Sequence, residues 1–143
     1  MDQDVVRQKL ESLRRCVNRV ADKCPADAAT LAADPDLQDI ITLNMSRAIQ
    51  LCVDVGAHLI TSLDLPAPTT MGQTFELIGR AGVVPVQLAA RLQRAVGFRN
   101  IVIHNYEAID WQLVHSLARD HLGDFADFAR AVSDDLRRRG MAL

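Results

Sequence analysis

The segment "PDLQDIITLNMSRAIQLCVDVGAHLITSL", residues 35–63, decides the fold. Its apolar residues recur at helical spacings of three, four or seven positions: Leu37, Ile41, Ala48, Cys52, Val55, Leu59 and Leu63. This period predicts one long helix with a buried face. Asp34 and Pro35 form a suitable N-cap and first helical residue. Gly56 lies inside the helix, where glycine costs about 1 kcal/mol relative to alanine, and this indicates close packing against a neighbour.

In the segments on either side, the apolar residues also recur with the period of a helix. Before the long helix, Val6, Leu10, Leu13, Val17 and Val20 lie on one stripe, and Asp2 is a candidate N-cap. The stretch "KCPADAATLAADPD" then interrupts the pattern with two prolines. After the long helix, "PAPTTMG" predicts a loop.

The second half of the chain predicts four shorter helices. One passes through Phe75 to Ile78 and ends near residues 79–82, and the next begins at Pro85 and ends at Gly97. A helix through residues 109–117 is interrupted at Gly123, and a last one runs through residues 125–136. We expect residues 137–143 to be a frayed tail. The pattern predicts an all-α fold, an antiparallel bundle of four main helices plus short ones, as a single domain over residues 1–143.

Composition narrows the class of protein. The 143 residues are 49% hydrophobic and 24% charged, with a net charge of −2, which is an ordinary globular balance. A charge this small does not favour binding of nucleic acid by bulk charge alone. The N-terminus lacks the apolar stretch of a signal peptide and no apolar run reaches the length of a membrane span, so we expect a cytoplasmic protein without a membrane partner.

The three cysteines do not favour a metal site. Cys16, Cys24 and Cys52 are odd in number and form neither a CxxC pair nor a Cys/His cluster with zinc spacing. We expect Cys16 and Cys52 to be small core residues in a reducing compartment.

The stretch "FRNIVIHNY", residues 98–106, contains several polar side chains next to a run of three apolar residues. It holds Arg99, His104 and the only tyrosine, Tyr106. On one straight helix Arg99 and His104 would lie about 140° apart. Asn105 favours a turn after His104 that could alter this geometry.

Histidine and arginine together suit reactions of a phosphodiester. Histidine takes and gives a proton near neutral pH, and the arginine fork fits phosphate oxygens. One histidine cannot easily serve as base and acid at two separate oxygens, but a twofold dimer would supply a second copy. In RNA the 2′-hydroxyl can be the nucleophile, so neither a metal nor a protein nucleophile is required. Local chemistry alone leaves open a purely structural histidine and tyrosine.

The motif resembles that of HEPN-domain proteins, in particular HepT-like toxins. The family pattern is arginine, a polar residue, three further residues, histidine, any residue and tyrosine. Arg99, Asn100, His104 and Tyr106 fill it here. Similar features surround it: the first amphipathic helix, the long helix with "NMSRAIQLCVDVGAHLI", the segment "TFELIGRAG", and "EAID" after the tyrosine.

The resemblance implies a homodimeric helical bundle with the two motifs at a shared cleft. It implies a metal-independent endoribonuclease, without a cofactor, that acts as the toxin of a toxin–antitoxin pair. By this similarity Arg99 holds the phosphate and His104 transfers protons. Asn100 orients one or both of these side chains, and Tyr106 lines the cleft. Tyr106 is also the expected site of adenylylation by a cognate minimal nucleotidyltransferase antitoxin. The alternative is a non-catalytic nucleotide-binding or dimerisation partner of such an enzyme.

Further residues are weaker candidates. Four arginines and no carboxylate lie between Leu77 and Tyr106, and three of the four are candidates for binding RNA: Arg80, Arg91 and Arg94. Arg47 could face the motif or simply be solvated, and Trp111 could anchor a dimer interface or fill the core. Asp110 could pair with Tyr106 or cap a helix. We expect surface or helix-packing roles for His58, His115 and His121.

Overall fold

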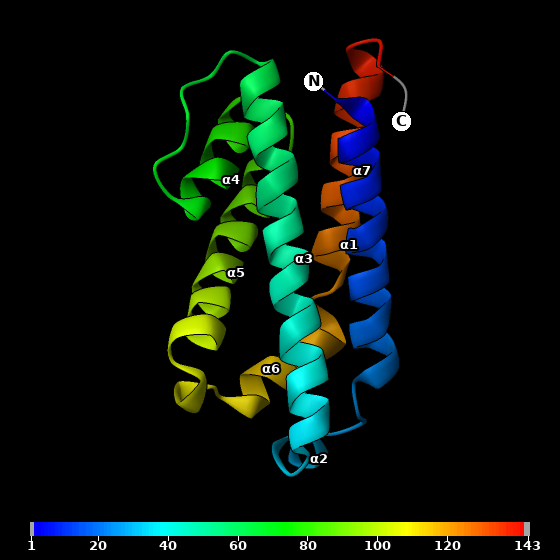
Figure 1. Ribbon diagram of the computed structural model, residues 1–143, viewed down its shortest axis with the longest axis vertical. Coiled ribbons are helices and arrows are strands. Elements are labelled where there is room, and N and C mark those ends of the chain that lie inside the picture. Colours follow the sequence, from blue (N-terminus) through cyan, green and yellow to red (C-terminus); the bar gives the residue numbers. More distant parts are fainter. Residues whose placement is uncertain (1, 142–143) are drawn as a thin grey trace.

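The computed structural model describes residues 2–141, which form helices and connecting turns and contain no β-strand (Figure 1). The helices are α1 (Gln3–Lys23), α2 (Ala28–Ala32), α3 (Pro35–Ser62), α4 (Met71–Arg80), α5 (Val86–His104), the 3-10 helix η1 (Tyr106–Ala108), α6 (Trp111–Asp120) and α7 (Gly123–Arg138). The expected all-α fold is confirmed. The short helix α2 was not predicted, because it lies within the segment interpreted as an interruption.

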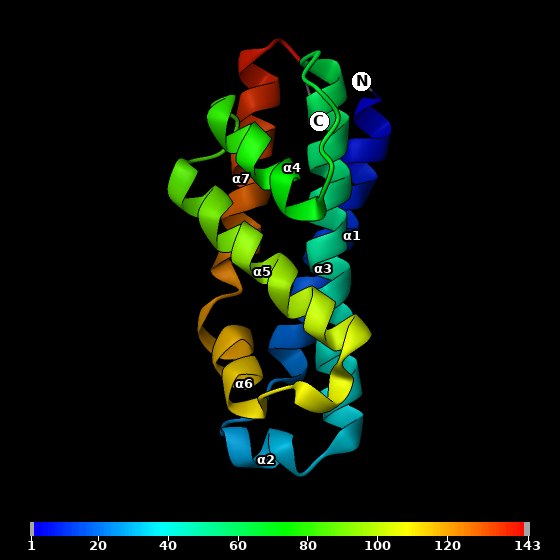
Figure 2. The same ribbon diagram turned by 90° about the vertical axis from the view of Figure 1, so that its left-hand side faces the viewer.

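The long helix α3 is the centre of the bundle. It packs along α1 on one side and against α4 and α5 on the other, while α7 lies beside α1 (Figure 1). Figure 2 shows α5 crossing the bundle obliquely, with α2 and α6 together at one end. The four main helices are therefore α1, α3, α5 and α7. None of the helices in the described part of the chain is both long enough and apolar enough to span a bilayer.

The predicted caps hold the ends of the main helices. The Asp2 carboxylate accepts hydrogen bonds from the backbone N–H groups that open α1, and Asp34 does the same for α3, with Pro35 as the first helical residue. Each cap satisfies backbone donors that the helix itself leaves free, which stabilises a helix by about 1 kcal/mol.

Two adjoining hydrophobic clusters form the core. The larger lies among α1, α3, α4, α5 and α7, where Phe75 and Phe128 meet edge to face with ring centroids 6.3 Å apart. The smaller lies toward α2 and α6 and includes Leu31, Ile41 and Val114. Cys52 is fully buried in the larger cluster as expected. The core role expected for Cys16 is only partly met, since its side chain is half-buried at the edge of that cluster.

The predicted end of a helix at Gly97 is wrong, because α5 continues to His104. One internal glycine costs about 1 kcal/mol. The neighbour Val96 is buried, which contributes about 1.5–3 kcal/mol, and Phe98 packs against the core while partly buried. The free energy gained by packing therefore outweighs the helix-propensity cost of Gly97. The helix ends at Asn105, whose backbone (φ −150°, ψ 57°) is not helical.

The predicted frayed tail is also wrong for residues 137–141. Helix α7 reaches Arg138, and the guanidinium of Arg139 lies 2.9 Å from the Asp135 carboxylate. The Met141 N–H donates to the Leu136 carbonyl at 2.8 Å, and the Met141 side chain packs against the larger cluster. Residues 142 and 143 lie outside the described residues.

Gly56 provides the first prediction. A Cβ atom at this position would lie 2.5 Å from Thr74 Cγ2 on α4, too close without a shift of one helix. We expect Gly56→Ala to lower the free energy of unfolding by about 1–2 kcal/mol, because the overpacking cost exceeds the gain in helix propensity. A thermal melt measures the effect as a Tm several degrees lower.

Gly97→Ala is the matched control for this change. It is also a glycine within a helix, but nothing lies within 4 Å of its Cβ position, so the same substitution should leave Tm unchanged or raise it. An unchanged or higher Tm for Gly56→Ala would contradict close packing of α3 against α4.

Candidate active site

A groove between α3 and α5 contains part of the motif predicted from the sequence. We call it the motif groove; its volume is about 490 Å³. Its lining residues are Asp39, Thr42, Leu43, Ser46, Arg47 and Gln50 from α3, Arg99, Val102 and Ile103 from α5, and Tyr106 from η1. The groove is therefore apolar along its α5 wall, with arginines on both sides and the tyrosine at one end.

Tyr106 is held by α3 and α6. Its hydroxyl donates a 2.9 Å hydrogen bond to Asp39 Oδ1, and its ring meets Trp111 edge to face with centroids 5.9 Å apart. Burial and the hydrogen bond to the Asp39 carboxylate raise the pKa of the Tyr106 phenol. The side chain nevertheless remains 39% exposed. Tyr106 is thus a protonated, oriented hydroxyl that a reagent from solvent can reach.

Arg99 faces the groove with its charge available. Its Nη1 donates to Asn100 Oδ1 at 3.3 Å, so a neutral amide contacts the guanidinium. Among the described residues neither Arg99 nor Arg47 has a carboxylate within ion-pairing distance. Two unneutralised guanidiniums beside one groove favour the binding of a phosphate.

His104 does not join Arg99 in this groove. It is the last residue of α5, is exposed, and is absent from the groove lining, as is Asn100. Because α5 stays helical through this segment, the rotation of about 140° between Arg99 and His104 separates their side chains. The expected turn after His104 is present at Asn105, but it does not bring His104 back to Arg99.

Large apolar side chains are exposed around the motif. Ile101, Ile103 and Leu113 are 43%, 50% and 51% exposed, and Leu43 on the wall of the motif groove is 48% exposed. Exposed apolar residues are ordinary when they are scattered, but here they gather around one end of α5. This clustering is typical of a surface that another protein covers.

The expected basic patch of Arg80, Arg91 and Arg94 does not form beside the motif. Arg80 pairs with Glu76 one turn earlier on α4, and Arg91 pairs with Asp124 on α7 at 3.0 Å. Arg94 is exposed but lines a different groove, between α5 and α6. The segment between Leu77 and Tyr106 contains no carboxylate. Glu76, just before it, pairs with Arg80, and the fold brings Asp124 to Arg91.

Asp39 was not predicted as a site residue from the sequence, and the role of Arg47 remained open. Both lie on the face of α3 that borders the motif groove, and Asp39 accepts the hydrogen bond from the Tyr106 hydroxyl. A signal was present: polar side chains recur along α3 at Asp39, Thr42, Ser46 and Gln50, a spacing of three or four residues within an otherwise apolar helix. Such a polar stripe indicates a face that borders a polar site, although Thr42 and Ser46 are themselves buried in the structure.

The remaining candidates have structural roles. Asp110 is the N-cap of α6 and not a partner of Tyr106. His115 Nε2 lies 2.8 Å from the Pro25 carbonyl oxygen, which confirms a packing role, while His58 is half-buried and His121 exposed. Trp111 is half-buried against the smaller core cluster and Tyr106. Within residues 2–141 no three His, Cys, Asp or Glu side chains are grouped as metal ligands.

Comparison with known proteins agrees with the fold and the motif. Residues 4–132 match the model of a family described as ribonuclease HepT-like. The "mRNA nuclease HepT" of Shewanella oneidensis is 28% identical over 129 residues, which cover 90% of this chain and 96% of that protein. The match therefore includes the whole segment that carries the motif.

Solved structures are similar over the same length. The HEPN toxin of Shewanella oneidensis, solved in tri-AMPylated form with an MNT antitoxin, has a TM-score of 0.86 and 26% identity over 94% of this chain and 99% of that chain. A toxin–antitoxin structure with AMP-PNP has a TM-score of 0.87 and 26% identity, covering 92% and 99%. Fold and motif define an all-helical HEPN-type protein. The chain belongs to the HepT-like ribonuclease family.

Proposed function

We propose that this protein is a metal-independent endoribonuclease, the toxin of a cytoplasmic toxin–antitoxin pair, with RNA as its substrate. The observation that carries the proposal is the motif groove. In a chain of the HepT-like ribonuclease family, Arg99 and Tyr106 of the motif line one groove, and Arg99 forms no ion pair with a carboxylate of residues 2–141. A phosphodiester fits a groove of this charge, and RNA supplies its own nucleophile.

The complete site is formed by two copies of the chain. His104 lies outside the motif groove of its own chain, so a twofold dimer is the arrangement that brings histidines and arginines of two motifs to one phosphate. The exposed Ile101, Ile103 and Leu113 around the motif support this arrangement, because a second copy would bury them. Asn100, which accepts a hydrogen bond from Arg99, orients the guanidinium.

The proposed reaction accounts for every proton transfer and for the bonds formed and broken without a metal ion. One His104 takes the proton of the 2′-hydroxyl as its oxygen attacks phosphorus, and the bond from phosphorus to the 5′-oxygen breaks. The second His104 gives a proton to that leaving oxygen. Arg99 neutralises the charge that grows on the phosphoryl oxygens. The products are a 2′,3′-cyclic phosphate and a free 5′-hydroxyl.

Tyr106 is the regulatory site in this proposal. The Shewanella oneidensis toxin was solved tri-AMPylated and in complex with an MNT antitoxin, and by similarity a cognate minimal nucleotidyltransferase modifies Tyr106 here. The phenol oxygen would attack the α-phosphorus of a nucleoside triphosphate and displace pyrophosphate. Asp39, which accepts the hydrogen bond of the phenol, is positioned to take its proton.

RNA cleavage in the presence of EDTA tests the proposal. We expect the purified dimer to cut unmodified RNA at the same rate with and without the chelator, and mass spectrometry to find 2′,3′-cyclic phosphate ends. The same RNA with 2′-O-methyl groups should not be cut, since its nucleophile is blocked.

Cleavage that requires magnesium, or products with a 5′-phosphate, would contradict this mechanism. Absence of cleavage by unmodified protein, with the intact mass equal to the calculated mass, would favour the alternative function. In that case the bundle would be a non-catalytic nucleotide-binding or dimerisation partner of a nucleotidyltransferase.

A further inference from the structure

A second groove lies on the other side of α3, between α3 and α1. We call it the α1/α3 groove, and its volume is about 720 Å³. Its lining residues are Ser12, Arg15, Cys16 and Arg19 from α1, and Ile40, Leu43, Asn44, Arg47, Gln50 and Leu51 from α3. Three arginines and no carboxylate therefore line this groove.

The three arginines are not neutralised by ion pairs. None of Arg15, Arg19 and Arg47 forms a salt bridge with a carboxylate of the described residues. Arg15 instead donates to Ser12 Oγ at 3.1 Å. Other arginines on α1 differ: Arg7 pairs with Asp4 and Arg14 pairs with Glu11. Arg15 and Arg19 therefore line the groove without an ion-pair partner, whereas the paired Arg7 and Arg14 do not line it.

Arginines lie on both sides of the groove, Arg15 and Arg19 on α1 and Arg47 on α3. Burial raises the pKa of the half-buried Cys16 thiol, and the nearby charges of Arg47 and Arg15 act in the opposite direction. Guanidiniums from α3 and α1 therefore approach the same thiol from two helices. Both helices that form the groove therefore carry positive charge close to Cys16.

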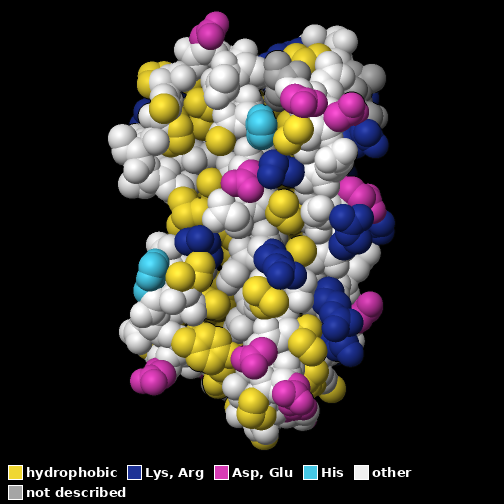
Figure 3. Space-filling model, in the orientation of Figure 1, with side chains coloured by type: hydrophobic (Ala, Val, Ile, Leu, Met, Phe, Trp, Pro, Cys, Tyr) yellow, Lys and Arg dark blue, Asp and Glu magenta, His cyan; other side chains and the backbone are white. Residues whose placement is uncertain are grey.

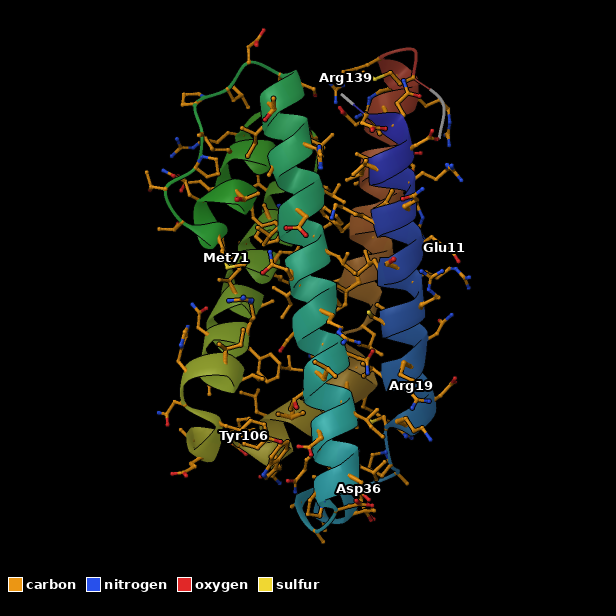
Figure 4. All side chains as sticks on the ribbon, viewed as in Figure 1. Glu11, Arg19, Asp36, Met71, Tyr106 and Arg139 are labelled. Atoms are coloured by element: carbon orange, nitrogen blue, oxygen red, sulfur yellow. The ribbon has the colours of Figure 1, made fainter. Side chains whose placement is uncertain are left out.

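The α1/α3 groove adjoins the motif groove. Leu43, Arg47 and Gln50 line both, so α3 is a ridge between them, with Arg47 on that ridge. In Figure 3, Lys and Arg side chains form a broken row across the middle of this face, over α5, α3 and α1. Figure 4 shows the labelled Tyr106 and Arg19 on opposite sides of α3.

We propose that the α1/α3 groove binds the sugar–phosphate backbone of RNA next to the scissile phosphate, and that Arg47 guides the strand across α3. The proposal rests on the function proposed above and extends its substrate site. A surface with several arginines that have no ion-pair partner among the described residues suits a polyanion better than a surface whose charges are paired. No aromatic side chain lines the groove, so bases do not stack there and binding is independent of sequence.

Binding of two RNA lengths tests the inference. The probes are 2′-O-methyl RNAs of about 4 and about 16 nucleotides, the range of sites in single-strand-binding grooves. The variant is Arg15→Ala/Arg19→Ala, because these two residues line only the α1/α3 groove. We expect its affinity for the long probe to fall about 10- to 30-fold at about 0.1 M salt, with little change for the short probe.

Salt dependence adds a second readout. Loss of two phosphate contacts should reduce the slope of log affinity against log salt by about 1.4, that is, by about 0.7 per contact on a single strand. Arg7→Ala/Arg14→Ala is the matched control, since it removes the same charge from the same helix at paired positions. The control should bind both probes like the wild type.

Three results would overturn the inference. Equal losses of affinity for both probes, or an equal loss of affinity in the control variant, would mean that RNA binding depends on net charge alone. Unchanged RNA affinity with weaker binding of the cognate nucleotidyltransferase would assign the groove to that protein. A change from dimer to monomer on size-exclusion chromatography would assign it to contacts between copies.

The probes separate this inference from the proposed function. A 2′-O-methyl RNA cannot be cut, so its affinity reports binding whether or not the protein is a nuclease. If the double variant binds the long probe like the wild type while the wild type cleaves unmodified RNA in EDTA, only the inference fails. If the groove binds the long probe but unmodified RNA is not cut, only the proposed nuclease function fails.

Discussion

We expect His104→Ala to lower the rate of RNA cleavage by about 10²- to 10⁴-fold, the range for loss of a positioned acid or base. The variant removes both histidines from the dimer, so neither proton transfer is assisted. His104 is exposed at the end of α5 and packs against nothing in the core, so the fold and its thermal stability should be retained. The measurement is cleavage of unmodified RNA in EDTA, with circular dichroism and Tm as checks of folding.

His121→Ala is the matched control. His121 is also an exposed histidine at the end of a helix, since it follows the last residue of α6, but it lies outside the motif and borders the groove between α5 and α6. This control should cleave RNA at the wild-type rate. Wild-type activity in His104→Ala itself would remove His104 from the chemistry and contradict the proposed mechanism.

A mixed dimer extends the test to the composite site. A dimer with one wild-type chain and one His104→Ala chain keeps one histidine. If one histidine acts as base and the other as acid on the same phosphate, the mixed dimer should lose nearly as much activity as the full variant. Retention of half of the wild-type activity would mean that each chain cuts RNA by itself.

Adenylylation of Tyr106 should lower cleavage by about 10²- to 10³-fold, comparable with loss of one transition-state charge contact. Tyr106 lines the same groove as Arg99, so an attached nucleotide would place a phosphate beside that guanidinium. The phosphate would neutralise the charge that the substrate needs, and the nucleotide would fill the groove. The 39% exposure of the tyrosine makes the hydroxyl accessible to a modifying enzyme.

The measurement combines mass and activity. The protein is incubated with its purified nucleotidyltransferase and ATP, intact mass gives the number of adenylyl groups, and cleavage is assayed before and after. Tyr106→Phe is the control, because it keeps the ring against Trp111 and lacks only the acceptor oxygen. It should remain active after the same treatment. Silencing of Tyr106→Phe, or full activity of the modified wild type, would exclude Tyr106 as the regulatory site.

Local sequence rules were sufficient for most of the helices. The stripe of α1, the caps at Asp2 and Asp34, and the loop before α4 were all predicted, because each depends on residues within one or two turns of one another. The motif was also recognisable, since its residues lie close together in the chain. Rules of this kind failed at Gly97, where the packing of α5 against distant helices outweighs a local preference.

The tertiary structure alone decided which charged groups are free and which residues share a groove. Tyr106 and Asp39 are 67 residues apart and meet only because α3 and α5 pack together. Arg91 is neutralised by Asp124, 33 residues away, while Arg47 and Arg99 lie beside one groove and have no ion-pair partner within residues 2–141. Propensity and periodicity depend on neighbours along the chain, whereas a binding site depends on distances between helices. Those distances are set by packing of the whole core.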